Sequence, residues 1–225
     1  MKKAKIFALV IILSALSTTQ ANILCGEPNG TADLFDWQDG QSLYGLFGDP
    51  TPIGGNTLAF FPSGFRAESI DDSADSVYDL LEFELTAHSG FSFQNITITE
   101  YGDYGVFDTG GVQVFGSLTV TNLDTMESLT AITNSDLSTP ETDATLPWQA
   151  WTQLDIGASD WTHIKIAFEN HLYAASDDGS IAFIEKKVVG NAITLQTIPE
   201  PATITILSIG AVVMFGNLRN KKTVI

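Results

Sequence analysis

The sequence has one cysteine, Cys25, in 225 residues, which excludes a disulfide-stapled scaffold and a cysteine-rich zinc site. Basic residues are also scarce, since ten Lys and Arg stand against 27 Asp and Glu, a net charge of -17. This balance excludes binding to nucleic-acid backbones as a main activity, because phosphates are held by Lys and Arg. Hydrophobic residues make up 44% of the chain, enough to bury a core, so wholesale disorder is excluded.

The signatures of common catalytic sites are missing as well. The chain has no Gly-x-Ser-x-Gly, no His-Glu-x-x-His, no Gly-x-x-x-x-Gly-Lys and no Cys-x-x-Cys. Glu82 and Glu84 share one face of a predicted strand about 7 Å apart and face water, so this pair does not indicate a catalytic site. The three histidines, His88, His163 and His171, show no convergence in the sequence. The sequence therefore predicts a protein that is not an enzyme.

Residues 1–21 have the pattern of a secretory signal peptide. Three lysines occur within the first five residues, an apolar run follows over 6–13, and small and polar residues lead to a cleavage site after Ala21. The apolar run is too short to cross a hydrocarbon core of about 30 Å. We expect export through the Sec translocon followed by cleavage; the alternative is an anchor that stays attached.

A second apolar segment lies near the C-terminus. Residues 202–218 carry no charge, and as a helix they would measure about 25 Å at ~1.5 Å per residue. Arg219, Lys221 and Lys222 follow at once, which places the C-terminus in the cytoplasm by the positive-inside rule. The pattern predicts a transmembrane helix that leaves the preceding residues outside.

Pro199, Glu200 and Pro201 stand immediately before this helix. The triad, the apolar helix and the basic cluster together resemble the PEP-CTERM sorting signal of Gram-negative bacteria. The resemblance covers residues 198–222 and implies recognition by the membrane enzyme exosortase, cleavage near the triad, and release or attachment at the surface of exopolysaccharide-producing, biofilm-forming cells. It implies no molecular activity. The alternative is an ordinary single-span anchor.

These segments divide the chain into a signal peptide at 1–21, an ectodomain at 22–197 and a sorting signal at 198–225. Residues 22–198 hold 26 acidic and four basic side chains, which gives a charge of -22. Such a surface stays soluble and resists anionic lipid headgroups, so we expect membrane contact only through the C-terminal helix. The expected location is the cell envelope, cell surface or extracellular matrix.

The ectodomain has the pattern of an all-β domain. Apolar residues alternate with polar ones at Leu81, Phe83 and Leu85, as in a strand with one wet face. Gly116 suggests a bulge. Eight to ten short strands predict an antiparallel β-sandwich, jelly-roll-like, with a closed barrel as the alternative. Further strands are predicted at 42–47, 57–61, 91–98, 112–120, 164–168, 181–184 and 192–195, and a surface loop at 133–146.

Clustered carboxylates are candidate ligands for a structural calcium ion, because calcium takes six to eight oxygens. Two clusters offer such ligands, Asp71, Asp72 and Asp75 in one and residues 103–108 in the other, although neither fits the EF-hand loop. Asp177-Asp178-Gly179 has instead the pattern of a hairpin turn. No other cofactor is indicated.

Aromatic residues near loops and strand ends are the candidates for carbohydrate binding, since a sugar's apolar face stacks on flat rings. Trp148 and Trp151 are three residues apart, so in an extended strand they face opposite sides and one of them belongs to the core. The candidates are Trp37, Tyr44, Trp148, Trp151 and Trp161.

Three functions stay open from the sequence. The first is a non-catalytic surface or matrix protein, the second a module that binds carbohydrate such as exopolysaccharide, and the third a secreted hydrolase. An exposed aromatic cluster on one sheet face would favour the second. Converging carboxylates or histidines in a cleft would favour the third, and a featureless acidic surface the first.

Overall fold

Strands and turns make up the described part of the chain, which in the computed structural model covers residues 22–137, 143–157, 160–187 and 193–199. Over 193–199 only the backbone is described. No helix in these ranges is long and apolar enough to cross a membrane. The predicted signal peptide and transmembrane helix lie outside them.

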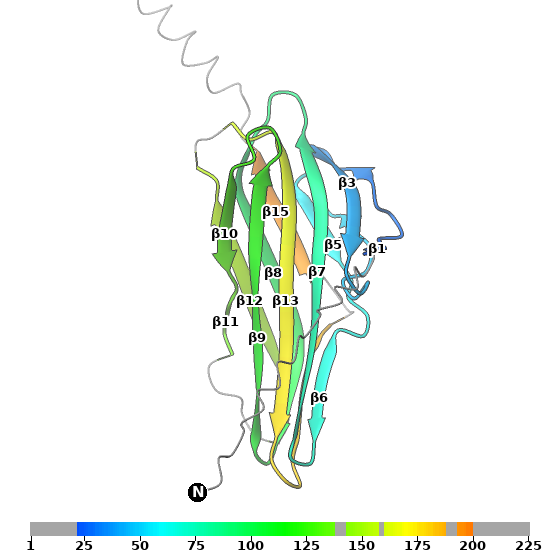
Figure 1. The fold of residues 1–225 in the computed structure, drawn as a ribbon, viewed down its shortest axis with the longest axis vertical. Helices are drawn as coiled ribbons and strands as arrows, with labels where there is room; N and C mark the ends of the chain where they lie inside the picture. Colours follow the sequence, from blue (N-terminus) through cyan, green and yellow to red (C-terminus); the bar gives the residue numbers. More distant parts are fainter. Residues whose placement is uncertain (1–21, 138–142, 158–159, 188–192, 200–225) are drawn as a thin grey trace, which may run out of the picture.

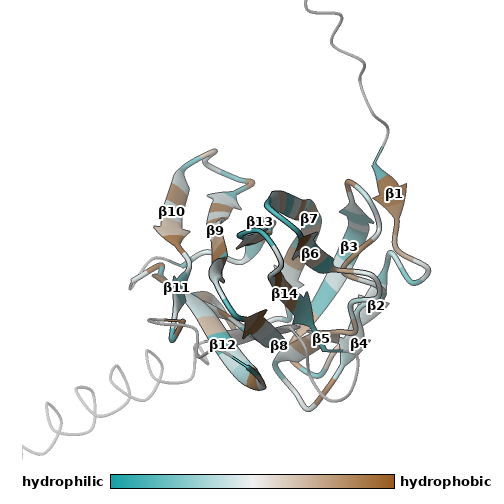
Figure 2. Ribbon diagram, turned by 90° about the horizontal axis from the view of Figure 1, so that it is seen from below, coloured by the Kyte–Doolittle hydropathy of each residue, from teal (hydrophilic) through white to brown (hydrophobic). Residues whose placement is uncertain are grey.

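Two antiparallel sheets pack face to face with their strands along the long axis of the molecule (Figures 1 and 2). In the first sheet the strand order is β1-β3-β7-β13-β9-β10, and β2 pairs with β3. Its strands are β1 (Ile23–Leu24), β2 (Gly30–Thr31), β3 (Phe35–Ser42), β7 (Ser73–Ala87), β9 (Gly110–Asn122), β10 (Ser128–Ile132) and β13 (His163–Ser176).

The second sheet is built around β8, the strand that pairs with three others. Its order is β11-β12-β8-β15-β5-β4, and β14 pairs with both β8 and β6. Its strands are β4 (Thr51–Pro52), β5 (Thr57–Phe60), β6 (Arg66–Ile70), β8 (Phe93–Phe107), β11 (Asn134–Ser135), β12 (Ala144–Asp155), β14 (Ile181–Lys186) and β15 (Ile193–Pro199). The all-β class and the antiparallel sandwich are thus confirmed, and the jelly-roll type stays a prediction.

The core lies between the sheets and follows the period-two pattern. Leu81, Phe83 and Leu85 of β7 are buried, and so are Ile164 and Ile166 of the neighbouring β13. Burying each such side chain contributes about 1.5–3 kcal/mol, so the alternation fixes which face of each strand points inward.

The predicted bulge at Gly116 is wrong. The pairing of β9 with β13 runs without a register shift, and Gly116 lies opposite Asn170. A Cβ atom at Gly116 would collide with the carbonyl oxygen of Glu169 on β13. Glycine is therefore required here for the close approach of two backbones.

Two other boundaries differ from the expectation. The predicted strand at 42–47 is wrong, because β3 ends at Ser42 and a turn follows. The buried Asp79 carboxylate holds that turn by accepting hydrogen bonds from the Ser42 hydroxyl (2.5 Å) and from the amides of Tyr44 (2.9 Å) and Leu46 (2.7 Å). The predicted loop at 133–146 contains β11 and the first residues of β12, while 138–142 lie outside the described residues.

Candidate functional site

Four aromatic rings cross the outer face of the first sheet in a line, which we call the aromatic row: Tyr44, Tyr78, His171 and Phe115. His171 on β13 lies directly opposite Tyr78 on β7 and Phe115 on β9. These three positions point away from the core because each is out of phase with the buried residues of its strand. Tyr44 extends the row from the turn that Asp79 holds.

The rings of the aromatic row contact one another closely. Centroid distances are 5.1 Å between Tyr78 and His171 and 4.7 Å between His171 and Phe115, with interplanar angles of 13° and 8°. Tyr44 meets Tyr78 edge to face at 5.3 Å, and their hydroxyl oxygens are 3.1 Å apart. Tyr44, Tyr78 and Phe115 are 38%, 39% and 47% exposed. Cross-strand pairs stabilise a fold by only about 0.2–1 kcal/mol each. The contacts within the row therefore add little to the stability of the fold, although the row exposes the apolar surface of large rings to water.

A groove of about 360 Å³ adjoins the end of the row at Phe115. His171 stacks on the Phe115 ring, which is exposed and lines the groove. The Glu169 carboxylate lies 2.8 Å from His171 Nε2 and supplies a hydrogen-bond acceptor. The lining residues are Phe115, Gly116, Ser117, Ile132, Thr133, Glu169 and His171. A ring face beside hydroxyl and carboxylate groups can hold a sugar by stacking and hydrogen bonds.

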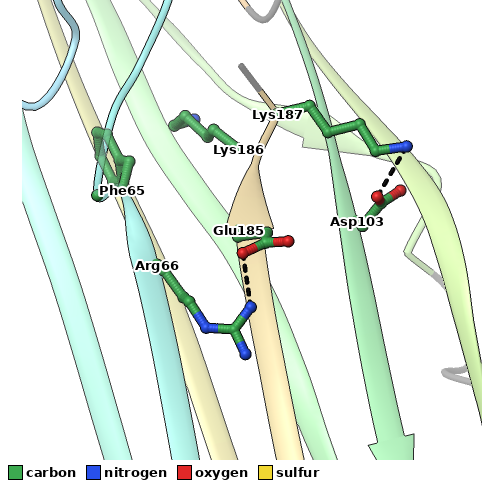
Figure 3. Close-up of a pocket in the computed structure, with 7 residues that line it drawn as sticks. Phe65, Arg66, Asp103, Glu185, Lys186 and Lys187 are labelled. Atoms are coloured by element: carbon green, nitrogen blue, oxygen red, sulfur yellow. Dashed lines mark hydrogen bonds and ion pairs between the residues drawn. The ribbon is translucent and has the colours of Figure 1, made fainter. Parts of the chain in front are cut away.

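A second groove, of about 430 Å³, opens beside β14 (Figure 3). Four charged residues of its lining form two ion pairs. The Arg66 guanidinium lies 2.5 Å from a Glu185 carboxylate oxygen, and Lys187 Nζ lies 2.7 Å from an Asp103 carboxylate oxygen. Each of these two carboxylates thus lies within ion-pair distance of a cation. Its lining residues are Gly64, Phe65, Arg66, Asp103, Glu185, Lys186 and Lys187.

The aromatic residues predicted to bind carbohydrate do not form one platform. Trp37, Trp148 and Trp161 are buried in the core, which corrects the prediction for these three. Their large apolar area explains the burial, and the Trp148 indole N–H donates to the buried-side carbonyls of Asp103 (3.3 Å) and Glu185 (3.1 Å).

Tyr44 and Trp151 are exposed but lie apart, because Tyr44 is in the turn after β3 of the first sheet and Trp151 is in a strand of the second. Trp151 belongs to β12 of the second sheet and faces the side opposite Trp148, as their spacing predicts. Only Tyr44 among the five candidates joins the aromatic row. The sequence analysis did not predict Tyr78, Phe115 and His171 as members of a binding surface. The signal that could have indicated them is an aromatic residue at a strand position that faces solvent.

The predicted calcium ligands Asp71, Asp72 and Asp75 take part in a turn and in hydrogen bonds to backbone amides. Asp71 and Asp72 form the two-residue turn that connects β6 of the second sheet to β7 of the first, with left-handed φ of 53° and 51°, which Asp tolerates better than most residues. Asp75 accepts hydrogen bonds from the amides of Glu68 (3.0 Å) and Ser76 (2.8 Å). Among the described residues no group of three or more His, Cys, Asp or Glu side chains is placed to hold a metal ion.

Each histidine lies beside its own carboxylate. His88 Nε2 is 3.1 Å from Asp36, His163 is 3.5 Å from Glu84, and His171 pairs with Glu169. The hydrogen bond to Asp36 raises the pKa of His88 above its ordinary value. Over the described ranges the histidines therefore do not converge on a catalytic centre.

The predicted sorting residues lie at the edge of the described chain. Pro199 is the last residue of β15 and pairs with Phe93 of β8. Glu200, Pro201, Arg219, Lys221 and Lys222 lie outside the described residues.

No family model matches the chain, and no curated protein is similar to it. Among solved structures the chain is similar to the enzymatically active domain of bacteriophage CBA120 tailspike protein 4, with a TM-score of 0.21 and 10% sequence identity. The similarity covers 59% of this chain and 19% of that chain.

Proposed function

We propose that this protein is an exported, non-catalytic protein of the bacterial cell surface that binds a neutral polysaccharide through the aromatic row and its groove. The observation that carries the proposal is the exposed line of four contacting rings on one sheet face, ending at a groove. Sugar rings have apolar faces and polar edges, so the exposed Phe115 ring and the Glu169 carboxylate suit both parts of the ligand.

The charge of the ectodomain favours a neutral ligand over an anionic one. All four of its basic residues are paired with carboxylates: Arg66 with Glu68 and Glu185, Lys165 with Glu82, Lys186 with Glu100, and Lys187 with Asp103. The remaining acidic side chains give the surface an excess of negative charge. An anionic polysaccharide would be repelled along most of its length.

The proposal of sorting to the cell surface rests on the resemblance of residues 198–222 to the PEP-CTERM sorting signal. The last described strand of the sandwich, β15, reaches Pro199, the first residue of the Pro-Glu-Pro triad. Cleavage by exosortase near the triad would then release or attach an intact sandwich of jelly-roll type. A signal peptide at 1–21 supplies the route out of the cytoplasm.

Replacing Phe115 by alanine is expected to weaken binding of a neutral polysaccharide about tenfold, because the ring face next to the groove is lost. Tyr78→Ala should act in the same direction by removing the support of His171. Affinity electrophoresis in gels containing dextran or alginate measures both effects, and we expect retardation by neutral dextran only.

Trp151→Ala is the matched control, because Trp151 is 39% exposed on the other sheet. It should leave retardation unchanged. Equal mobility of wild type and Phe115→Ala in dextran, or preferential retardation by alginate, would contradict the proposed binding face.

Sorting is tested by fractionation and intact-mass measurement in strains with and without exosortase. With exosortase we expect a product from about Asn22 to near Pro199 outside the cell, and without it a form that keeps the C-terminal segment. A full-length C-terminal segment in the membrane of both strains would show a plain anchor.

A further inference from the structure

Three polar side chains meet inside the sandwich, between its two sheets. The Lys186 ammonium group forms an ion pair with the Glu100 carboxylate, and both side chains are fully buried. Asn170 Nδ2 donates a 2.7 Å hydrogen bond to the other carboxylate oxygen of Glu100. Lys186 and Glu100 come from β14 and β8 of the second sheet, whereas Asn170 comes from β13 of the first.

The surroundings of this trio are apolar. Lys186 Nζ lies 4.7 Å from the centroid of the Phe65 ring and 5.4 Å from that of Trp148. Figure 3 shows Lys186 pointing toward Phe65 while Lys187, the next residue, points the other way to Asp103. A buried ion pair costs more desolvation than its attraction returns in many proteins, so this arrangement calls for a chemical reason.

Two further features fit a reaction between the amine and the amide. Burial lowers the pKa of Lys186 well below its ordinary value, which favours the neutral, nucleophilic amine. Asn170 Oδ1 is buried without a hydrogen-bond partner, so the amide is incompletely satisfied as it stands. Gly116 opposite Asn170 adds no side chain to the space around it.

We infer that Lys186 and Asn170 become joined by an isopeptide bond inside the folded domain, with Glu100 as the catalytic acid–base. The geometry for this is that one carboxylate contacts both reacting groups, through one oxygen each. Glu100 thereby holds the amine next to the amide and can move a proton between them.

The reaction balances without an added reagent. Proton transfer from the Lys186 ammonium to Glu100 leaves a neutral amine, whose lone pair attacks Asn170 Cγ while the C–O π electrons move to Oδ1. Glu100 gives its proton to Nδ2, the Cγ–Nδ2 bond breaks as the carbonyl re-forms, and Glu100 takes the excess proton from Nζ. The products are the Nζ–Cγ amide and one ammonia. The bond would connect the two sheets covalently in a chain whose single cysteine permits no internal disulfide.

Peptide mass spectrometry on the purified full chain tests the inference. Trypsin cuts after Lys165 and Lys187 but not at an acylated Lys186, so residues 166–187 should appear as one peptide, lighter by one ammonia. A second digestion at Asp177 and Asp178, between the joined residues, should leave the two halves attached to each other.

Other outcomes would overturn the inference. Unchanged mass with separable halves means that no bond forms. Loss of ammonia with separable halves indicates a succinimide at Asn170, and loss of one water indicates a Lys186–Glu100 amide instead.

Variants assign the roles, and the wild-type result stands even where a variant fails to fold. Glu100→Gln, Asn170→Ala and Lys186→Met should each abolish the linked product. Lys187→Met removes the neighbouring lysine, which is exposed, and should leave the linked product at the wild-type level. Linked product in Glu100→Gln at the wild-type level would remove Glu100 from the catalytic role.

Discussion

Replacing Lys186 by methionine is expected to lower the free energy of unfolding by about 3–5 kcal/mol, because it leaves the Glu100 carboxylate buried without a cation. Both side chains are fully buried, so water cannot take the place of the lost partner. If the isopeptide bond is present, its loss adds roughly 3 kcal/mol for a loop of this size. Urea denaturation followed by tryptophan fluorescence measures the change, since Trp148 lies beside Lys186.

Two variants serve as controls for this result. Lys187→Met removes an exposed ion pair with Asp103, which should cost less than about 1 kcal/mol. Adding Glu100→Leu to Lys186→Met removes the orphaned charge and should recover a large part of the loss. If Lys186→Met is as stable as Lys187→Met, loss of the buried Lys186–Glu100 pair does not lower the free energy of unfolding as predicted.

Replacing Gly102 by alanine is expected to destabilise the domain by about 3 kcal/mol, because β8 and β14 leave no space for a methyl group there. The added Cβ atom would overlap the carbonyl oxygen of Glu185 and lie 2.5 Å from Trp148 Nε1. Neither neighbour can yield, since the indole N–H is hydrogen-bonded to that same carbonyl at 3.1 Å. Thermal unfolding is a sufficient measurement.

Gly111→Ala is the matched control for Gly102→Ala. Gly111 lies in β9, and a Cβ atom there would meet nothing within 4 Å. Its effect should stay within about 0.5 kcal/mol of wild type. If the two substitutions change the stability equally, the lack of space at Gly102 is not the cause of the destabilisation.

The sequence predicted the fold best where a strand has one dry and one wet face. The alternation at Leu81, Phe83 and Leu85 located the second half of β7 (Ser73–Ala87) correctly, because burial imposes the period directly. Strands β3 (FDWQDGQS) and β6 (RAESI) were missed, since their apolar residues are too few to show a period. Their position depends on pairing with β7 and β14, which no local pattern reveals.

Apart from Tyr44, which lies in a turn, the residues of the aromatic row and of the buried Lys186–Glu100–Asn170 trio break the period of their strands. Glu100 is in phase with the buried Ile96 and Ile98 but carries a charge, and Asn170 stands between the buried Phe168 and Leu172 on the same face. Phe115 is an aromatic residue in a wet phase. In the sequence, the signal for these residues is a polar side chain at a strand position that faces the core, or an aromatic ring at a position that faces solvent. Which of these residues come together depends on how the strands pair, and that could not be predicted.

If the chain is attached beyond Pro199 as proposed, the position of β15 determines how the domain would carry a mechanical load. β15 lies between β8 and β5 and is hydrogen-bonded to both, and it ends at Pro199, next to the predicted point of attachment. Tension on the chain beyond Pro199 would act along this strand, so its two ladders of hydrogen bonds would be sheared together rather than opened one at a time. If the proposed attachment and polysaccharide binding hold, drag on the polymer would therefore act on an inner strand of the sheet and not on an edge strand.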